Sequence, residues 1–227
     1  MTLEPRLIIS GGMPAAGKTT TCEEITRRFH NVVYLDRDTI ISGGLLYFNP
    51  AKGEGLLSGR QYLGSEPFTE VETPFGRMLK MGWDLGYYYR HAEWPSRMAI
   101  GHQAAQALRL GKAPIFDCFL AEDVNNGTVE RFMSWDLFTG YPIYLIYFVV
   151  ETEMCKNRLF SRATVDEEAR RRTEILEAKF EEELRLRHTL SREGEAFVRQ
   201  FGKLIDTTDR SVDDCVEECL KYIKDEC

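Results

Sequence analysis

A glycine-rich segment near the N-terminus has the residue types and the spacing that bind phosphate. Residues 12–19 read GMPAAGKT, which is the pattern G-x-x-x-x-G-K-[ST]. Glycines let backbone N–H groups curl around phosphate oxygens, Lys18 can reach the β- and γ-phosphates, and the Thr19 hydroxyl can ligate Mg²⁺. An ordinary glycine-rich turn is the alternative. The ATP-binding residues predicted in this segment are Gly12, Pro14, Ala15, Ala16, Gly17, Lys18, Thr19 and Thr20.

Carboxylates at the ends of two apolar runs are the next candidates for chemistry. Residues 31–36 read NVVYLD and residues 114–117 read PIFD, so both runs end in an acid. Asp38 lies just beyond the first run, where it could take the proton of an acceptor hydroxyl as general base. Asp117 could bind the metal or its waters. Each acid could instead cap the following helix, and we assign Asp36 to that role.

Arginines on a later helical segment form a second group. Arg158 and Arg162 are four residues apart and have no acid four residues before them, unlike two members of the triplet 170–172. Planar guanidinium groups stabilise the negative charge of a transferring phosphoryl group. We therefore expect Arg158 and Arg162 to be catalytic together with Lys18, and Arg158 also to contact ATP. A solvated helix face is the alternative.

Aromatic and polar side chains around residues 83–91 suit a pocket for a small molecule. We expect Trp83, Tyr87 and Arg90 to bind the phosphate acceptor together with Asp38. At helical spacing, Trp83 and Tyr87 could equally belong to a hydrophobic core.

The elements that must position these residues alternate along the chain. Apolar runs and helical periodicity predict a three-layer α/β fold, a doubly wound parallel sheet of about five strands with right-handed crossovers. The predicted strands are 7–9, 31–36, 114–117, 143–150 and 203–206, and the predicted helices are 18–29, 75–89, 96–110, 124–138, 152–187 and 212–223.

The chain reads as a single domain over residues 1–227 with two additions. Residues 43–76 hold seven of the 18 glycines, with aromatics interleaved, so we expect residues 43–95 to be an inserted acceptor-binding region. Residues 152–188 are charged and helical with a thin apolar stripe, which indicates a helical lid.

Composition limits the classes of partner. The net charge of −7 disfavours an extended nucleic-acid surface, although a 5′ end stays open as an acceptor. The chain has no run of 18 apolar residues and no signal-peptide pattern, so we expect a cytoplasmic protein that does not enter a membrane. Six cysteines without C-x-x-C and four scattered histidines suggest no metal signature. A homodimer is compatible with these features.

Taken together, these motifs resemble the P-loop kinase group, which implies a nucleotide-kinase-like P-loop NTPase fold. Residues 115–120 (IFDCFL) and 206–212 (DTTDRSV) are similar to chloramphenicol phosphotransferase-like kinases, and residues 35–39 (LDRDT) to zeta-toxin-like kinases. The resemblance covers the core but not residues 43–95. It implies that Asp38 is the base, that Lys18 and Thr19 hold ATP and Mg²⁺, that Arg158 and Arg162 clamp the phosphates, and that residues 207–210, including Thr208, lie near the adenine.

The sequence therefore predicts an ATP-dependent kinase that phosphorylates a hydroxyl of a small molecule. Three alternatives stay open: a nucleotide or nucleic-acid 5′-hydroxyl kinase, a nucleotide-gated switch or ATPase, and a toxin-like kinase with a protein partner. The segment 43–95 is longer and more aromatic than the family pattern, so the resemblance does not identify the acceptor. The preference for ATP over GTP is also left open.

Overall fold

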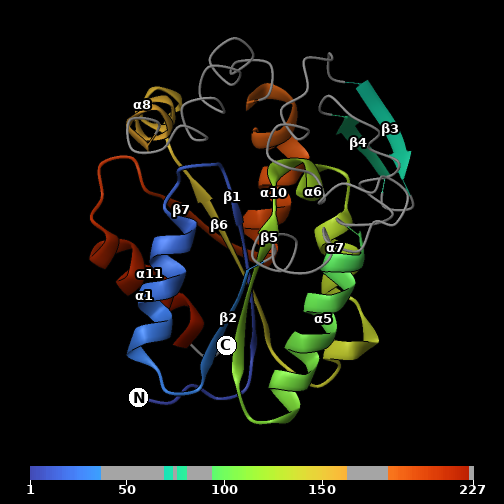
Figure 1. Ribbon diagram of the computed structural model, residues 1–227, viewed down its shortest axis with the longest axis vertical. Coiled ribbons are helices and arrows are strands. Elements are labelled where there is room, and N and C mark those ends of the chain that lie inside the picture. The colour runs from blue at the N-terminus through green and yellow to red at the C-terminus, as the bar shows by residue number, and fades with distance from the viewer. Residues whose placement is uncertain (37–68, 74–75, 81–93, 163–183, 225–227) are drawn as a thin grey trace, which may run out of the picture.

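The computed structural model describes residues 1–36, 69–73, 76–80, 94–162 and 184–224. Within them, five apolar segments form one parallel sheet (Figure 1). Its strands are β1 (Leu7–Gly12), β2 (Val32–Asp36), β5 (Ala113–Phe119), β6 (Ile143–Val149) and β7 (Gly202–Asp206), in the spatial order β2-β5-β1-β6-β7. β1 is the central strand, and all of its residues are buried because helices cover both faces of the sheet.

The helices form a layer on each face of the sheet (Figure 1). One layer contains α1 (Lys18–Arg28) and α11 (Val212–Lys224). The other layer contains α5 (Trp94–Arg109), α6 (Ala121–Asn125), α7 (Thr128–Met133), the 3₁₀ turn η3 (Asp136–Phe138) and α10 (Arg192–Phe201). Two further elements lie beyond the carboxyl end of β6: α8 (Thr152–Arg162) and the π-helical turn η4 (Leu184–His188).

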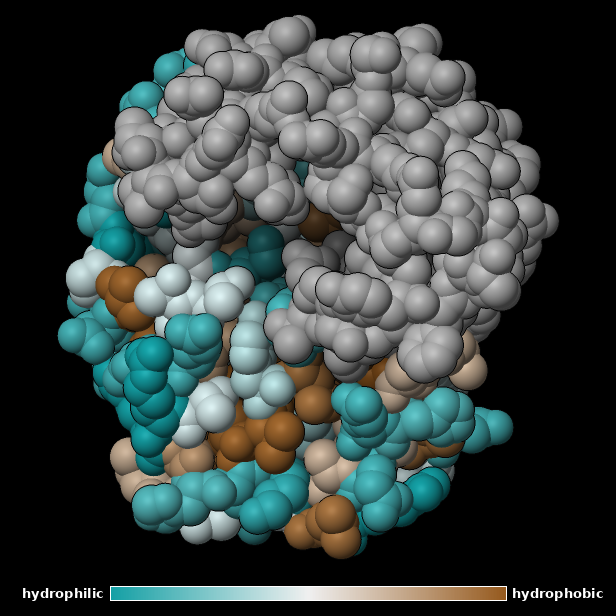
Figure 2. All heavy atoms as spheres, viewed as in Figure 1, coloured by the Kyte–Doolittle hydropathy of each residue, from teal (hydrophilic) through white to brown (hydrophobic). Residues whose placement is uncertain are grey.

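Alternation along the strands divides the core into two clusters. Ile8 faces α1 and α11, whereas its neighbour Ile9 faces the opposite layer, because successive side chains of a strand point to opposite faces. In the second cluster the rings of Phe116 and Phe132 stack with their centroids 4.5 Å apart. Figure 2 shows polar side chains over much of the described part of this face, with apolar side chains between the two helical layers.

A buried ion pair joins α5 to α6. The Arg97 guanidinium donates a hydrogen bond of 2.7 Å to Asp123, and both side chains are at most 2% exposed. Asp123 also accepts a hydrogen bond of 2.9 Å from the backbone N–H of Leu120. This pair fixes the segment that follows β5.

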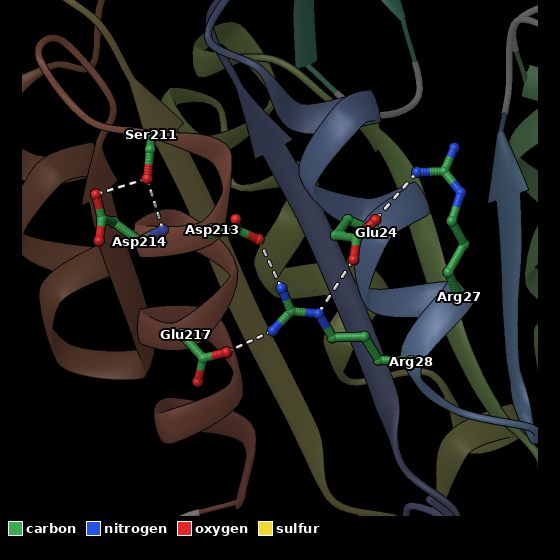
Figure 3. Close-up of polar contacts among 7 residues, drawn as sticks. All are labelled: Glu24, Arg27, Arg28, Ser211, Asp213, Asp214 and Glu217. Atoms are coloured by element: carbon green, nitrogen blue, oxygen red, sulfur yellow. Dashed lines mark hydrogen bonds and ion pairs between the residues drawn. The ribbon is translucent and has the colours of Figure 1, made fainter.

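The helices α1 and α11 are connected at their surface by one arginine (Figure 3). Arg28 donates to Glu24 on its own helix and to Asp213 and Glu217 on α11, at 3.2 Å for Glu24 and 2.7 Å for Asp213. Ser211 caps α11, since its hydroxyl oxygen accepts a hydrogen bond of 3.1 Å from the N–H of Asp214. The two helices that border the glycine-rich segment are therefore held at a fixed separation.

The observed architecture confirms the predicted fold class and corrects two elements. The predicted helix 124–138 is interrupted, because Gly127 has φ +75° and separates α6 from α7. In the predicted helix 75–89, residues 76–80 form a strand, β4 (Gly76–Lys80), paired antiparallel with β3 (Thr69–Thr73). Pairing between neighbouring segments has overridden the helical periodicity there.

The carboxyl-terminal part of the predicted lid is helical and forms the π-helical turn Leu184–His188. Residues 163–183 lie outside the described residues, so the continuity of the predicted helix 152–187 stays a prediction. The inserted region 43–95 and the middle of the lid lie largely outside the described residues, so these two assignments stay predictions. No helix among the described residues is long and apolar enough to cross a membrane.

Candidate functional site

The glycine-rich segment lies where open parallel sheets bind ligands. It follows the carboxyl end of β1, and β1 lies beside β6 in the sheet. The chain leaves β1 toward β2 on one side of the sheet and leaves β6 toward β7 on the other side. A crevice at such a reversal of direction is the usual ligand site in α/β folds.

Two glycines have conformations that the loop requires. Gly12 has φ +141°, and a Cβ atom there would lie 2.2 Å from the carbonyl oxygen of Phe148. Gly17 has φ +79° and precedes the first residue of α1. Ala15 also has a positive φ, 55°, although it carries a side chain. An L-residue held in this region stores local strain, which is typical of functional loops.

The lysine of the loop is folded over the loop itself. Its ammonium group donates hydrogen bonds to the carbonyl oxygens of Gly12, at 3.0 Å, and Met13, at 2.9 Å. The cation therefore lies at the mouth of the loop, beside the N-terminus of α1. Both features favour an anion at this position.

Asp117 lies on β5, the neighbour of strand β1 that leads into the glycine-rich loop. It pairs in register with Ser10 of β1 and with Asp36 of β2. The residue is 7% exposed, and its carboxylate accepts a hydrogen bond of 2.8 Å from the Tyr34 hydroxyl. Burial, then the negative charge of Asp117, raises the pKa of Tyr34. The Tyr34 hydroxyl therefore lies against the Asp117 carboxylate as a neutral donor.

A buried cysteine, Cys22, lies close to Ser10 and Asp117. The Cys22 thiol of α1 is buried and makes a hydrogen bond of 3.5 Å to the Ser10 hydroxyl. Burial, followed by the negative charge of Asp117, raises the pKa of Cys22 well above its usual value. The thiol stays protonated at neutral pH, so it acts as a small packing residue rather than a metal ligand.

Arg158 joins the loop to the segment after β7. Its guanidinium donates to the carbonyl oxygens of Thr207, at 2.8 Å, Thr208, at 3.1 Å, and Ala15, at 3.4 Å. It also donates to the Thr207 hydroxyl at 3.2 Å. The neighbouring Cys155 thiol donates to the Pro14 carbonyl oxygen at 3.2 Å. Two side chains of helix α8, Cys155 and Arg158, therefore attach this helix to the glycine-rich loop.

A cavity of about 310 Å³ opens beside the loop, between α1, α8 and α11. Four predicted ATP-binding residues of the loop line it, together with Arg158. Thr207 and Arg210 also line it, and both come from the segment expected near the adenine. The lining residues are Ala15, Ala16, Gly17, Thr20, Thr21, Arg158, Ser161, Thr207, Arg210, Ser211, Val212 and Cys215.

Thr208 is not among the lining residues of this cavity. Its hydroxyl donates to Asp206 at 2.6 Å and accepts from the backbone N–H of Glu151 at 3.0 Å. The hydrogen bonds from Thr208 lower the pKa of Asp206. This side chain ties the end of β7 to the start of α8, and its contact with ATP stays a prediction.

Several predicted site residues fall outside the described part of the chain. These are Asp38, Trp83, Tyr87 and Arg90, and the side chain of Arg162 at the end of α8. Their assigned roles stay predictions. In the described part, sequence reasoning missed Tyr34. Its position two residues before Asp36 places both on one face of β2, but only the neighbouring strand shows that this face meets Asp117.

The oxygen groups near the loop fit Mg²⁺. Mg²⁺ usually keeps several waters and is bound through one or two carboxylates plus the phosphates of its substrate. Thr19 and Asp117 offer one hydroxyl and one carboxylate, both hard oxygen donors. A self-sufficient metal site is not present in the described residues, where no group of three or more His, Cys, Asp or Glu side chains could hold a metal ion.

No family model and no curated protein matches this chain. Solved structures are similar in fold at low identity. A protein of Chloroflexus aurantiacus, provisionally assigned as a kinase, is 17% identical with a TM-score of 0.53, covering 97% of each chain. A sugar kinase of a Janibacter species is 13% identical with a TM-score of 0.51, covering 96% of this chain and 94% of that one.

The thymidylate kinase of Candida albicans is 12% identical with a TM-score of 0.50, covering 97% of this chain and 92% of the kinase. The chain has a nucleotide-kinase-like P-loop fold. At these identities the likeness shows the fold alone, and it extends over nearly the full length of each of these proteins. The likeness to chloramphenicol phosphotransferase and zeta-toxin kinases rests on the sequence motifs only.

Proposed function

We propose that this protein is a kinase that transfers the γ-phosphoryl group of ATP to a hydroxyl of a small molecule. The observation that carries the proposal is the continuity of the phosphate loop with the cavity of about 310 Å³. A phosphate-binding loop next to a cavity that could take a base and a ribose is the arrangement expected of a nucleoside triphosphate site. The similarity in fold to proteins named as sugar and thymidylate kinases is compatible with this function.

The nucleotide would occupy both parts of the site. Its phosphates would lie against the loop N–H groups and the Lys18 ammonium, which would exchange its hydrogen bonds to Gly12 and Met13 for phosphate oxygens. Its base would lie between the loop and the start of α11. Arg158 would hold the two walls of this site together, and Arg210 would add positive charge at its edge.

Mg²⁺ would neutralise charge on the β- and γ-phosphates when bound with ATP. Thr19 and Asp117 would hold it, the hydroxyl directly and the carboxylate directly or through water. The chain's own contribution is to fix these oxygens in place before the nucleotide arrives, because catalysis of phosphoryl transfer consists mainly of positioning and charge stabilisation.

The acceptor would bind on the side of residues 43–95. There Asp38 would accept the proton of the acceptor hydroxyl, and Trp83, Tyr87 and Arg90 would contact the acceptor. Arg162, one turn beyond Arg158 on α8, would approach the phosphates when the acceptor region closes and excludes water. These roles follow from the sequence motifs and from the position of β2 at the edge of the sheet.

The test is ADP release from Mg·ATP in the presence of different acceptors. A panel of sugars, aminoglycoside and phenicol antibiotics, nucleosides, nucleoside monophosphates and 5′-hydroxyl oligonucleotides covers the classes that the sequence leaves open. Stimulation by one class supports the proposal and names the acceptor. Tight ATP binding with no stimulation by any acceptor, and slow hydrolysis that a partner protein alters, would favour a nucleotide-gated switch instead.

Two variants separate the parts of the mechanism. Replacing the loop lysine, Lys18→Ala, should abolish ATP binding or turnover, and unchanged turnover would contradict the phosphate-loop assignment. Asp38→Asn should leave ATP affinity intact while transfer falls by about 10² or more, the scale of a lost general base. Wild-type transfer in Asp38→Asn would show that Asp38 is a structural cap.

A further inference from the structure

Tyr34 occupies an unusual place in the proposed nucleotide site. It lies on β2, and its hydroxyl donates a hydrogen bond of 2.8 Å to the Asp117 carboxylate, 83 residues away in the chain. The acceptor is one of the two groups assigned to the metal, and it is held by a side chain from the neighbouring strand of the sheet.

The direction of this hydrogen bond decides what the tyrosine can do. The Tyr34 hydroxyl is the donor and the Asp117 carboxylate is the acceptor. A hydrogen bond to a charged group restricts the rotation of the carboxylate, so its oxygens are held in one orientation before a metal arrives.

We propose that Tyr34 is a positioning residue that orients Asp117 for the Mg²⁺ that accompanies ATP. The inference rests on the proposed function and deepens it. Tyr34 need not touch the nucleotide or the metal, and it acts through the Asp117 carboxylate. It is half-buried on the α1 side of the sheet, packed against the same apolar cluster as Ile8 and Ile25, so its ring is held in place by packing.

The experiment measures ATP affinity with and without metal in wild-type protein and in Tyr34→Phe. The phenylalanine keeps the ring and removes only the hydroxyl. A fluorescent ATP analogue is titrated in excess EDTA and again in excess Mg²⁺, and the ratio of the two affinities gives the gain from metal. The matched control is Tyr144→Phe, which removes a hydroxyl from a tyrosine packed against the same cluster, where Arg6 donates to it at 3.4 Å.

Tyr34→Phe should bind the analogue in EDTA as wild-type protein does, which also shows that the site is folded. Its gain from Mg²⁺ should fall about ten-fold, the scale of one lost hydrogen bond to a charged group. Tyr144→Phe should keep the full gain. In a double variant with Asp117→Ala, the loss should be no larger than that of Asp117→Ala alone, because the tyrosine acts through the carboxylate.

A wild-type gain from Mg²⁺ in Tyr34→Phe would overturn the inference and leave the kinase proposal intact. Additive losses in the double variant would also overturn it, since the tyrosine would then act independently of Asp117. If the wild-type protein itself binds ATP with no gain from Mg²⁺, the proposed function fails and the inference fails with it. A protein that shows the expected pattern but phosphorylates no acceptor would support the inference alone.

Discussion

Replacing Arg158 tests whether this arginine connects the walls of the proposed nucleotide site or acts on the phosphates of a bound nucleotide. Its guanidinium donates to the Thr207 and Thr208 carbonyl oxygens at 2.8 and 3.1 Å, and more weakly to Ala15 at 3.4 Å. An arginine engaged in this way holds three backbone segments together. Arg158→Ala should therefore lower both the stability of the protein and its affinity for ATP.

The size of the effect can be worked out from the geometry. A hydrogen bond from a charged donor contributes about 1.5–3 kcal/mol net, and two of the Arg158 bonds to carbonyl oxygens are short. The Arg158 side chain is half-buried, so water can replace some of the hydrogen bonds that the variant loses. The free energy of unfolding should fall by about 2–3 kcal/mol, which corresponds to roughly 4–12 °C in Tm for a chain of this size.

Urea unfolding and ATP titration of Arg158→Ala provide the assay. Arg158→Lys should recover less than half of the loss, because one ammonium group cannot bridge carbonyl oxygens as a planar fork does. The control is Arg199→Ala, an exposed arginine paired with Glu195 on α10, which should change stability by less than about 0.5 kcal/mol. Unchanged stability with a large fall in kcat at constant KM would refute the reasoning and place Arg158 on the transferring phosphoryl group.

Three further changes test other parts of the fold. Gly12→Ala should abolish ATP binding and destabilise the protein in thermal unfolding, because the new Cβ would lie 2.2 Å from the Phe148 carbonyl oxygen; a variant with normal affinity would contradict this. Asp123→Asn should lower the free energy of unfolding, measured in urea, by about 3–5 kcal/mol, because the Arg97 charge is then buried without its counter-charge. The double variant Asp123→Asn/Arg97→Met removes that charge and should lower the free energy of unfolding by less. Hydrogen bonds from two arginines lower the pKa of Glu24, so the stability that its carboxylate contributes is present at neutral pH and is lost as the pH falls through that pKa. Glu24→Gln should therefore flatten the acid side of a plot of Tm against pH. An unchanged plot would contradict this role of Glu24.

Most of the secondary structure could be predicted from the sequence, because the decisive signals are local. Apolar runs marked all five strands of the sheet, and the helices α1, α5 and α11 were expected within about two residues of their observed ends. The failures have equally local causes. Gly127 adopts a left-handed conformation inside a helical pattern, and Gly76–Lys80 pairs with a neighbouring strand although its sequence also suits a helix.

The site was predictable only in part. The spacing of Gly12, Gly17 and Lys18 predicts a phosphate loop by itself, because the geometry of such a loop depends on backbone freedom within a few residues. The contacts of Arg158 could not be predicted from local sequence in the same way. Its carbonyl partners at 207 and 208 are about 50 residues distant, and the periodicity of its own helix shows only that it has no acidic neighbour.

By itself, the sequence determined which segments form the strands of the five-stranded sheet, where the glycine-rich loop begins and which acids follow those strands. Only the tertiary structure decided the neighbours of each strand, because buried parallel strands share one apolar pattern and are joined by crossovers that do not encode order. The placement of β5 between β1 and β2 brings Asp117 beside the loop and Tyr34 beside Asp117. The contact between Tyr34 and Asp117 is therefore a property of strand order, and no single stretch of the sequence contains it.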